Sequence, residues 1–459
     1  MTNIQELKRY KKIYMIGIGG VSMSGIAEIL KNWGFSVYGS DISASEVTDK
    51  LISNGIDVSI GHNLSKLSQA DLVIFSAAIQ NNDIELVEAH KLGIPVVERA
   101  DFLGEITKCF RNTLCVSGTH GKSTTTSMLS MCFLEAKKDP TIQIGAALDA
   151  IDGNYKVGNS DFFILEACEY VESFLKFFPK AEIILNIDND HLDYYGSLDN
   201  IKASFIKYVK LLPDDGILVY NADDENCSHL SQYTKAKSLT FGINSSNANF
   251  VAKNISFDKN GFPSFDVYYN NTFYKTMKLS VPGKHNVLNA LSCIALCNEF
   301  GLDKNDIKNA LQKYKGAHRR FEYIGEFNDV KVYDDYGHHP TEINAVYDAL
   351  SKKNYNHSWV IFQPHTYSRT KELLDEFASS LMKFDNIVVT DIYAAREKNT
   401  YGISAKDIVE KIDSMGRTAY YIPNFDDIVE FIKRNAKPDD IVLTQGAGTI
   451  TQIGPKLVD

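Results

Sequence analysis

Short apolar runs recur along the chain, and each ends in glycine or polar residues. Between them, apolar positions follow the three-to-four-residue spacing of an amphipathic helix. In the first block we expect strands in residues 12–18, 35–41, 71–79 and 94–98 and a helix in residues 99–112. Strand-like runs that alternate with helical patterns are typical of parallel sheets with crossover helices. The pattern therefore predicts an α/β protein.

A second block opens at residues 113–129, again as a strand, a glycine loop and a helix. It continues with strand-like runs in residues 161–169, 181–191 and 216–226, all ending in polar residues. In residues 265–281 the apolar period changes to two, with Asn270-Asn271 as a turn, which predicts a small antiparallel insert. A helical pattern in residues 285–300 closes the block.

A third block carries reactive side chains where its apolar runs end. These runs lie in residues 331–340, 358–370, 386–397, 418–423 and 440–449. Ligands of open α/β sheets bind at the carboxyl ends of the strands, so we expect a site there. At about 150 residues per domain, 459 residues suggest three domains. We predict them at residues 1–109, 110–318 and 319–459.

Composition narrows the class of protein. Hydrophobic residues make up 44% and charged residues 23%, which excludes a disordered chain. A net charge of −10 disfavours non-specific binding to nucleic acid or to an anionic membrane, so we expect neither partner. The seven cysteines are scattered and form no C-x-x-C pair, which argues against structural zinc and disulfides. Reduced thiols favour a cytoplasmic location.

The N-terminus offers one alternative to this location. Lys8, Arg9, Lys11 and Lys12 precede the uncharged residues 13–27, as in a secretory signal peptide. The stretch holds several glycines and continues into an amphipathic segment, which favours a folded strand, loop and helix. No other apolar run approaches the ~18 residues that span a bilayer.

The first glycine loop has the form Gly17-x-Gly19-Gly20 between a predicted strand and helix. Its backbone could approach a pyrophosphate, and Asp41, at the end of the next strand, could contact a ribose. Because Ser22 replaces the third glycine of the dinucleotide fingerprint, the loop does not specify which nucleotide binds. A tight turn without a ligand is the alternative.

The second glycine loop carries a lysine and a serine. In residues 117–123, Gly121-Lys122-Ser123 suits a phosphate cradle: Lys122 neutralises charge and the Ser123 hydroxyl reaches Mg²⁺. The first glycine of the usual motif is missing, since Val116 stands there. Glu166 and His191 end two later runs and are plausible metal ligands, although either alone could be an ordinary polar residue.

Polar aromatic residues and histidines concentrate in the third block. Tyr336, His338 and His339 lie at the C-terminal end of one run, and His365 and Arg369 lie at the C-terminal end of the next. Three histidines and an arginine at strand ends indicate a site for a small anion, with Arg369 binding a carboxylate through two N–H groups.

Nine motifs occur in one order over the whole chain: GIGGVSMSG, GTHGKSTTT, EACEY, NIDNDHLDYYG, GKHNVLNALS, HRRFE, DDYGHHPTE, FQPHTYSRT and GAGT. The set resembles the Mur ligase family. DDYGHHPTE and FQPHTYSRT are similar to the branch that adds L-alanine, whereas the lysine loop alone would also admit folylpolyglutamate synthases. The lysine that other branches carboxylate is absent, since Ala203-Ser204-Phe205 stands there. The branch that returns whole peptides to UDP-N-acetylmuramate is harder to exclude.

The resemblance implies three domains: a Rossmann-like UDP-sugar-binding domain, a P-loop ATPase-like central domain and a Rossmann-like C-terminal domain that binds the amino acid. It implies an ATP-dependent ligase of peptidoglycan synthesis that joins L-alanine to the lactyl carboxylate of UDP-N-acetylmuramate through an acyl phosphate. ATP and Mg²⁺ are the expected cofactors, and a monomer or homodimer is the expected state.

The resemblance also assigns residues. For UDP-sugar it implies Gly17, Gly19, Gly20, Asp41 and Ser76. For ATP it implies Gly118, Thr119, His120, Gly121, Lys122, Ser123, Thr124, His285, Asn289, Arg320 and Asp335. For the amino acid it implies Tyr336, His338, His365 and Arg369. Ser123, Glu166 and His191 would bind Mg²⁺, and Lys122, Glu166 and His191 are the expected catalytic residues.

Two questions stay open at this stage. The base that accepts the amine proton could be His191 or His338. An NAD-dependent oxidoreductase built on the first glycine loop is the hypothesis from another class, but it leaves the lysine loop and the pair Glu166 and His191 unexplained. A nucleotide-binding scaffold without activity is a weaker alternative, because polar residues converge at three sites.

Overall fold

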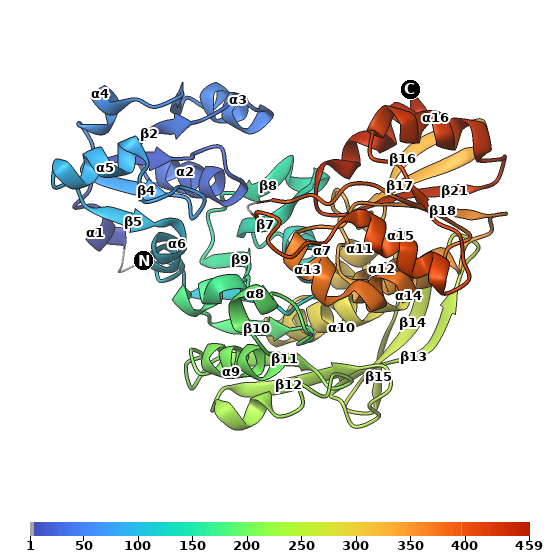
Figure 1. The fold of residues 1–459 in the computed structure, drawn as a ribbon. Helices are drawn as coiled ribbons and strands as arrows, with labels where there is room; N and C mark the ends of the chain where they lie inside the picture. Colours follow the sequence, from blue (N-terminus) through green and yellow to red (C-terminus); the bar gives the residue numbers. More distant parts are fainter. Residues whose placement is uncertain (1–3, 396) are drawn as a thin grey trace. The chain divides into compact units, whose positions relative to one another are not determined.

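The computed structural model describes residues 4–395 and 397–459 (Figure 1). These residues form two compact units. Unit one comprises the chain up to Asn186 together with Lys202–Thr240 and Ala295–Asp303. Unit two comprises Ile187–Ile201, Phe241–Ile294 and Lys304–Asp459. The chain passes from one unit to the other within α9 (Leu198–Val209), β12 (Lys237–Gly242) and α10 (Lys284–Glu299).

The first sheet of unit one has the order β3-β2-β1-β4-β5 and is parallel throughout. Its strands are β1 (Lys12–Ile16), β2 (Ser36–Asp41), β3 (Asp57–Ile60), β4 (Leu72–Phe75) and β5 (Val96–Glu98). The accompanying helices are α1 (Ile4–Leu7), α2 (Val21–Asn32), α3 (Glu46–Ser53), α4 (Leu64–Leu67), α5 (Ile84–Lys91) and α6 (Arg99–Thr107). The four strands and the helix expected in this block are confirmed, and β3 was not foreseen. The apolar segment after Lys12 thus forms a buried strand, a loop and α2.

Six strands of unit one belong to the second, ten-stranded sheet, where they have the order β11-β10-β6-β9-β7-β8. Its strands are β6 (Asn112–Ser117), β7 (Thr141–Leu148), β8 (Gly153–Lys156), β9 (Phe162–Glu166), β10 (Ala181–Ile184) and β11 (Ile217–Asn221). Among these six described strands, β7 and β8 pair antiparallel, and the other neighbours pair parallel. The helix α7 (Lys122–Glu135) follows β6 directly after the glycine loop.

Unit two contains an antiparallel ribbon of β13 (Phe250–Phe257), β14 (Pro263–Tyr269) and β15 (Thr272–Lys278). The turn between β14 and β15 is Asn270-Asn271, and both residues have positive φ, 47° and 64°. Two positive φ values match the right-handed twist of a two-residue hairpin, and asparagine tolerates them. The predicted antiparallel insert with this turn is confirmed.

The C-terminal sheet of unit two has the order β16-β17-β21-β18-β19-β20. Its strands are β16 (Glu322–Phe327), β17 (Val330–Asp335), β18 (Ser358–Phe362), β19 (Asn386–Val389), β20 (Tyr420–Tyr421) and β21 (Ile441–Gln445). All neighbours are parallel except β16 and β17. The helices of this part are α11 (Lys304–Lys313), α12 (Pro340–Leu350), α13 (Tyr367–Glu372), α14 (Leu374–Leu381), α15 (Ala405–Ser414), α16 (Phe425–Asn435) and α17 (Ile453–Val458).

Helices cover both faces of this sheet, as Figure 1 shows for α16 on one side and α12, α14 and α15 on the other. Alternate residues of β18 serve the two cores: Val360 and Phe362 pack with α12 and α14, whereas Trp359 and Ile361 pack with α16 and α17. A strand buried on both faces reads as a continuous apolar run, which explains why SWVIF was recognisable.

Within the described residues, no helix combines the length and the apolar character that crossing a bilayer requires.

Candidate active site

The lysine loop of unit one connects β6 to α7 in the way a phosphate-binding loop does. Gly118 and Gly121 have φ of 134° and 86°, values that side chains rarely adopt. A Cβ at Gly118 would also lie 3.0 Å from the Cβ of Leu185. The loop therefore requires glycine at both positions, and it ends at the N-terminus of α7, where anions are stabilised. Ser123 and Thr124 lie in the first turn of this helix.

Lys122 points its ammonium group back into the loop. Its Nζ donates hydrogen bonds to the carbonyl oxygens of Gly118 and Thr119 at 2.7 and 2.9 Å, and to Glu169 Oε1 at 3.0 Å. Burial alone would lower the pKa of Lys122, but the charge of Glu169 outweighs burial and raises it. Lys122 is therefore positively charged at any physiological pH.

Asn186 fixes the middle of the loop, a role that we did not predict. Its Oδ1 accepts the backbone N–H of His120 at 2.8 Å, its Nδ2 donates to the His120 carbonyl at 3.0 Å, and its carbonyl accepts the N–H of Thr119 at 3.1 Å. The only signal in the sequence was its place at the head of NIDNDH, two residues beyond β10.

Glu166 ends β9 beside the loop. The backbones of Val116 and Glu166 are paired in neighbouring strands, so the carboxylate stands level with the start of the loop. Its Oε2 accepts the N–H of Gly145 at 2.8 Å, and a Cβ at position 145 would lie 2.7 Å from that oxygen. Hydroxyl and carboxylate oxygens are the ligands that Mg²⁺ prefers, so Ser123 and Glu166 fit a magnesium ion.

The five residues expected at the UDP-sugar converge at one edge of the first sheet. Asp41, the last residue of β2, accepts the N–H of Gly19 through Oδ2 at 2.8 Å. Gly17 has a φ of 74°, and a Cβ there would lie 3.4 Å from the Cβ of Ser76. Gly20 donates its N–H to the Gly17 carbonyl at 3.2 Å. The carboxyl ends of β1, β2 and β4 meet here, the usual place for a ligand.

In unit two, Asp335 and Arg320 flank Tyr336. Burial raises the pKa of Asp335 to about 7, although Arg320 and two backbone N–H groups oppose the shift. Those N–H groups belong to Gly337 and Phe321, at 2.7 and 2.8 Å. The Arg320 guanidinium lies 5.0 Å from the Tyr336 ring centre, a cation–π distance.

His285 and Asn289 lie one turn apart near the start of α10. Burial lowers the pKa of His285 to about 4, so its imidazole is neutral at pH 7. Asn289 donates through Nδ2 to Asn286 Oδ1 at 3.1 Å. Their place near adenine stays a prediction.

The residues expected at the amino acid form a cluster at the ends of β17 and β18. The rings of His338 and His365 are 5.3 Å apart, and Tyr336 meets His338 edge-on at 5.5 Å. His338 Nδ1 lies 3.2 Å from the Tyr336 carbonyl, so this nitrogen carries the proton and Nε2 keeps a lone pair. Arg369 Nη1 donates to His365 Nδ1 at 3.1 Å, which leaves the proton of His365 on Nε2.

Both imidazoles are neutral at physiological pH. Burial lowers the pKa of His338 to about 4. Burial, with help from the positive charge of Arg369, lowers the pKa of His365 to about 3. The cluster therefore offers one imidazole acceptor, on His338, and one imidazole donor, on His365.

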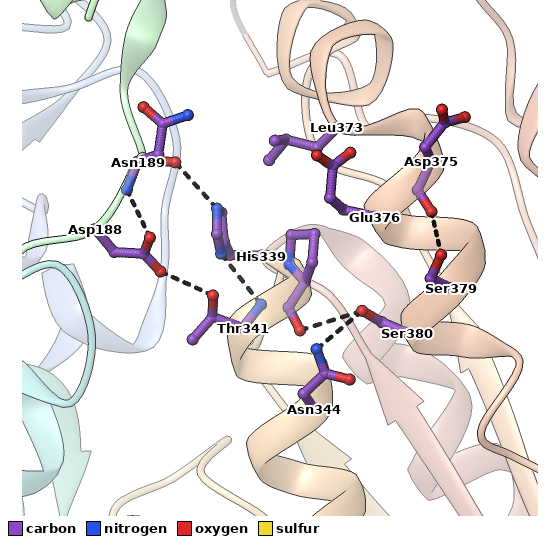
Figure 2. A pocket seen from close by; sticks show the side chains of 11 residues that line it. Asp188, Asn189, His339, Thr341, Asn344, Leu373, Asp375, Glu376, Ser379 and Ser380 are labelled. Atoms are coloured by element: carbon purple, nitrogen blue, oxygen red, sulfur yellow. Dashed lines mark hydrogen bonds between the residues drawn. The ribbon is translucent and has the colours of Figure 1, made fainter. Parts of the chain in front are cut away.

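The loop of Asp188, Asn189 and Asp190 belongs to unit two and is held by three side chains. Thr341 Oγ1 donates to Asp188 Oδ2 at 2.8 Å, and His339 Nε2 donates to the Asn189 carbonyl at 3.1 Å (Figure 2). The loop lines one side of a pocket of about 530 Å³ whose other walls are α12 and α14. The third contact joins Asp190 to Arg369.

His191 follows this loop with a φ of 56°, and its Nε2 lies 3.8 Å from Asp190 Oδ2. Burial alone would raise the pKa of Asp190, but the charge of Arg369 holds it well below its usual range. Glu166 lies in unit one and His191 in unit two, and their binding of Mg²⁺ stays a prediction.

A parallel α/β sheet with a glycine-lysine-serine loop at a helix N-terminus defines a protein that binds nucleotide phosphates. Family models identify the class more closely. The model "Mur ligase family, catalytic domain" matches residues 12–111, "Mur ligase middle domain" matches residues 116–297, and "Mur ligase, glutamate ligase domain" matches residues 319–448. The chain belongs to the Mur ligase family, and the α/β fold class with Mur ligase domains is confirmed.

Similarity to individual proteins extends over nearly the whole chain. A UDP-N-acetylmuramate–L-alanine ligase of Acetivibrio thermocellus is 48% identical, with 98% of this chain and 96% of the relative covered. One from Caldanaerobacter subterraneus subsp. tengcongensis is 46% identical, with 99% and 98% covered. The crystal structure of the UDP-N-acetylmuramate-alanine ligase of Thermotoga maritima superposes with a TM-score of 0.82 at 31% identity, over 97% and 98% of the two chains.

Proposed function

We propose that this protein is an ATP-dependent ligase that joins L-alanine to the lactyl carboxylate of UDP-N-acetylmuramate in peptidoglycan precursor synthesis. The observation that carries the proposal is similarity at 46–48% identity over nearly the full length to ligases of that name. The lysine loop and the cluster of His338, His365 and Arg369 supply groups that suit the reaction. A murein peptide ligase of Psychrobacter arcticus shares the fold with a TM-score of 0.72 but only 24% identity.

The chemical problem is that a carboxylate resists attack by an amine. We propose that the lactyl carboxylate attacks the γ-phosphorus of ATP, forming a C–O–P linkage and releasing ADP. Lys122 lies at the loop that would cradle the phosphates, and its positive charge screens the repulsion between carboxylate and phosphate. Mg²⁺, held by Ser123 and Glu166, would supply further neutralisation of the phosphate oxygens. The domain near the N-terminus would bind the UDP group at Gly17, Gly19, Gly20, Asp41 and Ser76.

In the second step the amine of L-alanine attacks the acyl phosphate, the C–N bond forms and phosphate leaves. Arg369 and His365 would orient the alanine carboxylate. The lone pair on His338 Nε2 can accept a hydrogen bond from the amine and, in the transition state, a proton. This fixed lone pair favours His338 over His191 as the proton acceptor, and His191 stays a proposed magnesium ligand.

The test is release of inorganic phosphate from ATP and Mg²⁺ with UDP-N-acetylmuramate, with and without L-alanine. We expect release only when both substrates are present, together with the mass of the amide product. A tripeptide, L-alanyl-γ-D-glutamyl-meso-diaminopimelate, is the comparison substrate. Release with the tripeptide and not with L-alanine would assign the protein to the peptide-recycling branch, and no release in any mixture would contradict a ligase.

A further inference from the structure

The guanidinium group of Arg369 is already engaged by protein groups. Its Nε and Nη2 both donate to Oδ1 of Asp190, at 3.2 and 2.8 Å. Its Nη1 donates to Nδ1 and to the carbonyl oxygen of His365, at 3.1 and 3.4 Å. The side chains of Arg369 and Asp190 are only 11% and 8% exposed, so water hardly competes for these contacts.

Arginine binds a carboxylate best along an edge that presents two parallel N–H groups. Asp190 occupies the edge formed by Nε and Nη2, and His365 takes the Nη1 side of the other edge. An incoming carboxylate therefore cannot gain two hydrogen bonds from Arg369 unless one of these partners yields. The incoming carboxylate can replace the carboxylate of Asp190 directly, since the two groups have the same shape and the same charge.

Such a replacement alone gives little free energy, because one buried ion pair is exchanged for another. An amino acid brings a second group, its amine, for which the His338 Nε2 lone pair is the acceptor in the same cluster. A simple carboxylate such as propionate, which is alanine without its amine, lacks that contact.

We propose that Asp190 is a specificity-determining positioning residue: it guards Arg369 in the empty site, so that only a carboxylate with a neighbouring amine displaces it. This inference rests on the proposed function and adds to it how the amino-acid site rejects other small carboxylates. Asp190 itself acts through Arg369 and is not part of the bond-forming machinery.

The experiment compares Asp190→Asn with the wild-type enzyme in the phosphate-release assay. Asparagine keeps the shape and removes the charge, so Arg369 loses its ionic partner. We expect the inhibition constant of propionate, competing with L-alanine, to fall by about tenfold or more, the scale of one charge-assisted hydrogen bond. The KM for L-alanine should fall in the same direction, while the KM values for ATP and UDP-N-acetylmuramate stay within about twofold.

The matched control is Asp375→Asn. Asp375 pairs with Lys411 at 2.7 Å in the same unit, and nothing links it to Arg369 in the described contacts. This variant should leave the propionate inhibition constant at the wild-type value. Asp190→Glu, which restores the charge, should return propionate inhibition towards wild type, a rescue that a purely structural role for Asp190 does not predict.

Each outcome decides a different claim. An unchanged or weaker inhibition by propionate in Asp190→Asn, with an active wild type, overturns the role of Asp190 and leaves the ligase assignment intact. A parallel rise in all three KM values also overturns it, since that indicates a distorted site. If the wild-type protein releases no phosphate, the proposed function fails and this inference falls with it. Should Asp190→Asn not fold, Asp190→Ser carries the same expectations.

Discussion

Single residues define the chemistry of the lysine loop, and Lys122 is the sharpest case. Its ammonium group is held by two loop carbonyls and Glu169, at the place where phosphates would bind. We expect Lys122→Ala to lower kcat/KM by about 10²-fold or more, as loss of a group that stabilises transferring charge does. Steady-state phosphate release measures this, with Lys207→Ala, which removes a lysine paired with Glu172 elsewhere in unit one, as the control. Full activity in Lys122→Ala would contradict the phosphate-binding role.

Glu182 is an acidic residue in the interior of unit one. It lies in β10 between Cys115 and Leu218 of the neighbouring strands, fully buried. Neither carboxylate oxygen has a hydrogen-bond partner in the described part of the chain, and burial raises the pKa of Glu182 well above its usual value. Glu182 therefore stays protonated to a higher pH in the folded protein than in the unfolded chain, where it ionises above about pH 4.3.

This difference makes stability depend on pH in a definite direction. Between about pH 4.3 and the raised pKa, the folded state binds one more proton than the unfolded state, so rising pH lowers the free energy of unfolding. We expect Glu182→Leu to raise the melting temperature, and its advantage over wild type to grow as the pH rises from about 4.3 towards the raised pKa of Glu182. Glu182→Gln, which cannot ionise, should show the same change with pH. Melting curves that shift in parallel for wild type and both variants would contradict a protonated buried Glu182.

At the scale of elements, the end of β10 supports the loop before α7. Asn186 offers a donor and two acceptors to the backbone of Thr119 and His120, as a neighbouring strand would. Asn186→Asp would lose the donor to the His120 carbonyl and place a negative charge beside the phosphate loop. We expect the KM for ATP to rise by about tenfold, the scale of one lost hydrogen bond together with the repulsion between the new carboxylate and the phosphates.

The control for this variant is Asn221→Asp. Asn221 ends the next strand, donates through Nδ2 to the Leu185 carbonyl at 3.0 Å and accepts the N–H of Asp223 through Oδ1 at 2.9 Å. It should change the KM for ATP far less than Asn186→Asp does. Equal effects of the two variants would mean that Asn186 stabilises the sheet rather than the loop.

Strands, turns and the polar residues at strand ends were predictable where a short stretch of sequence carries the signal. The apolar runs of β1, β9, β18 and β21 stand out because such strands are buried on both faces or nearly so. The hairpin at Asn270-Asn271 was predictable because the turn needs residues that accept positive φ. Short or half-exposed strands such as β3 and β16 carry no comparable run, so the pattern missed them.

Contacts between side chains distant in sequence were not predictable in this way. The ion pair of Asp190 and Arg369 joins residues 179 positions apart, and no pattern in the sequence indicates that these two residues meet. Burial of Glu182 without a partner was equally hidden, because its residue type suggests an exposed position. The ends of the predicted strands indicated which residues are candidates for chemistry. Which of these residues form hydrogen bonds or ion pairs with one another became clear only from the fold.

At the scale of the whole molecule, the division of the chain at residues 318 and 319 stays a prediction that a fragment can test. The entire C-terminal sheet, from β16 to β21, lies within residues 319–459. So do the buried members of the two cores on its faces, which run from Val330 to Leu457. Because helices cover both faces, this segment has what an independently folding domain needs, namely its own buried core.

We therefore expect a protein of residues 319–459 to fold alone and to unfold in a single cooperative thermal transition. The comparison is a fragment that begins at residue 340 and so lacks β16 and β17. Without β17, the edge of β21 around Val442 has no neighbouring strand. An unpaired edge and an uncovered apolar strand should leave that shorter fragment without a cooperative transition or aggregated. If the longer fragment also melts without cooperativity, the Ile187–Ile201 and Phe241–Ile294 segments of unit two are part of the same folding unit, and the predicted boundary is wrong.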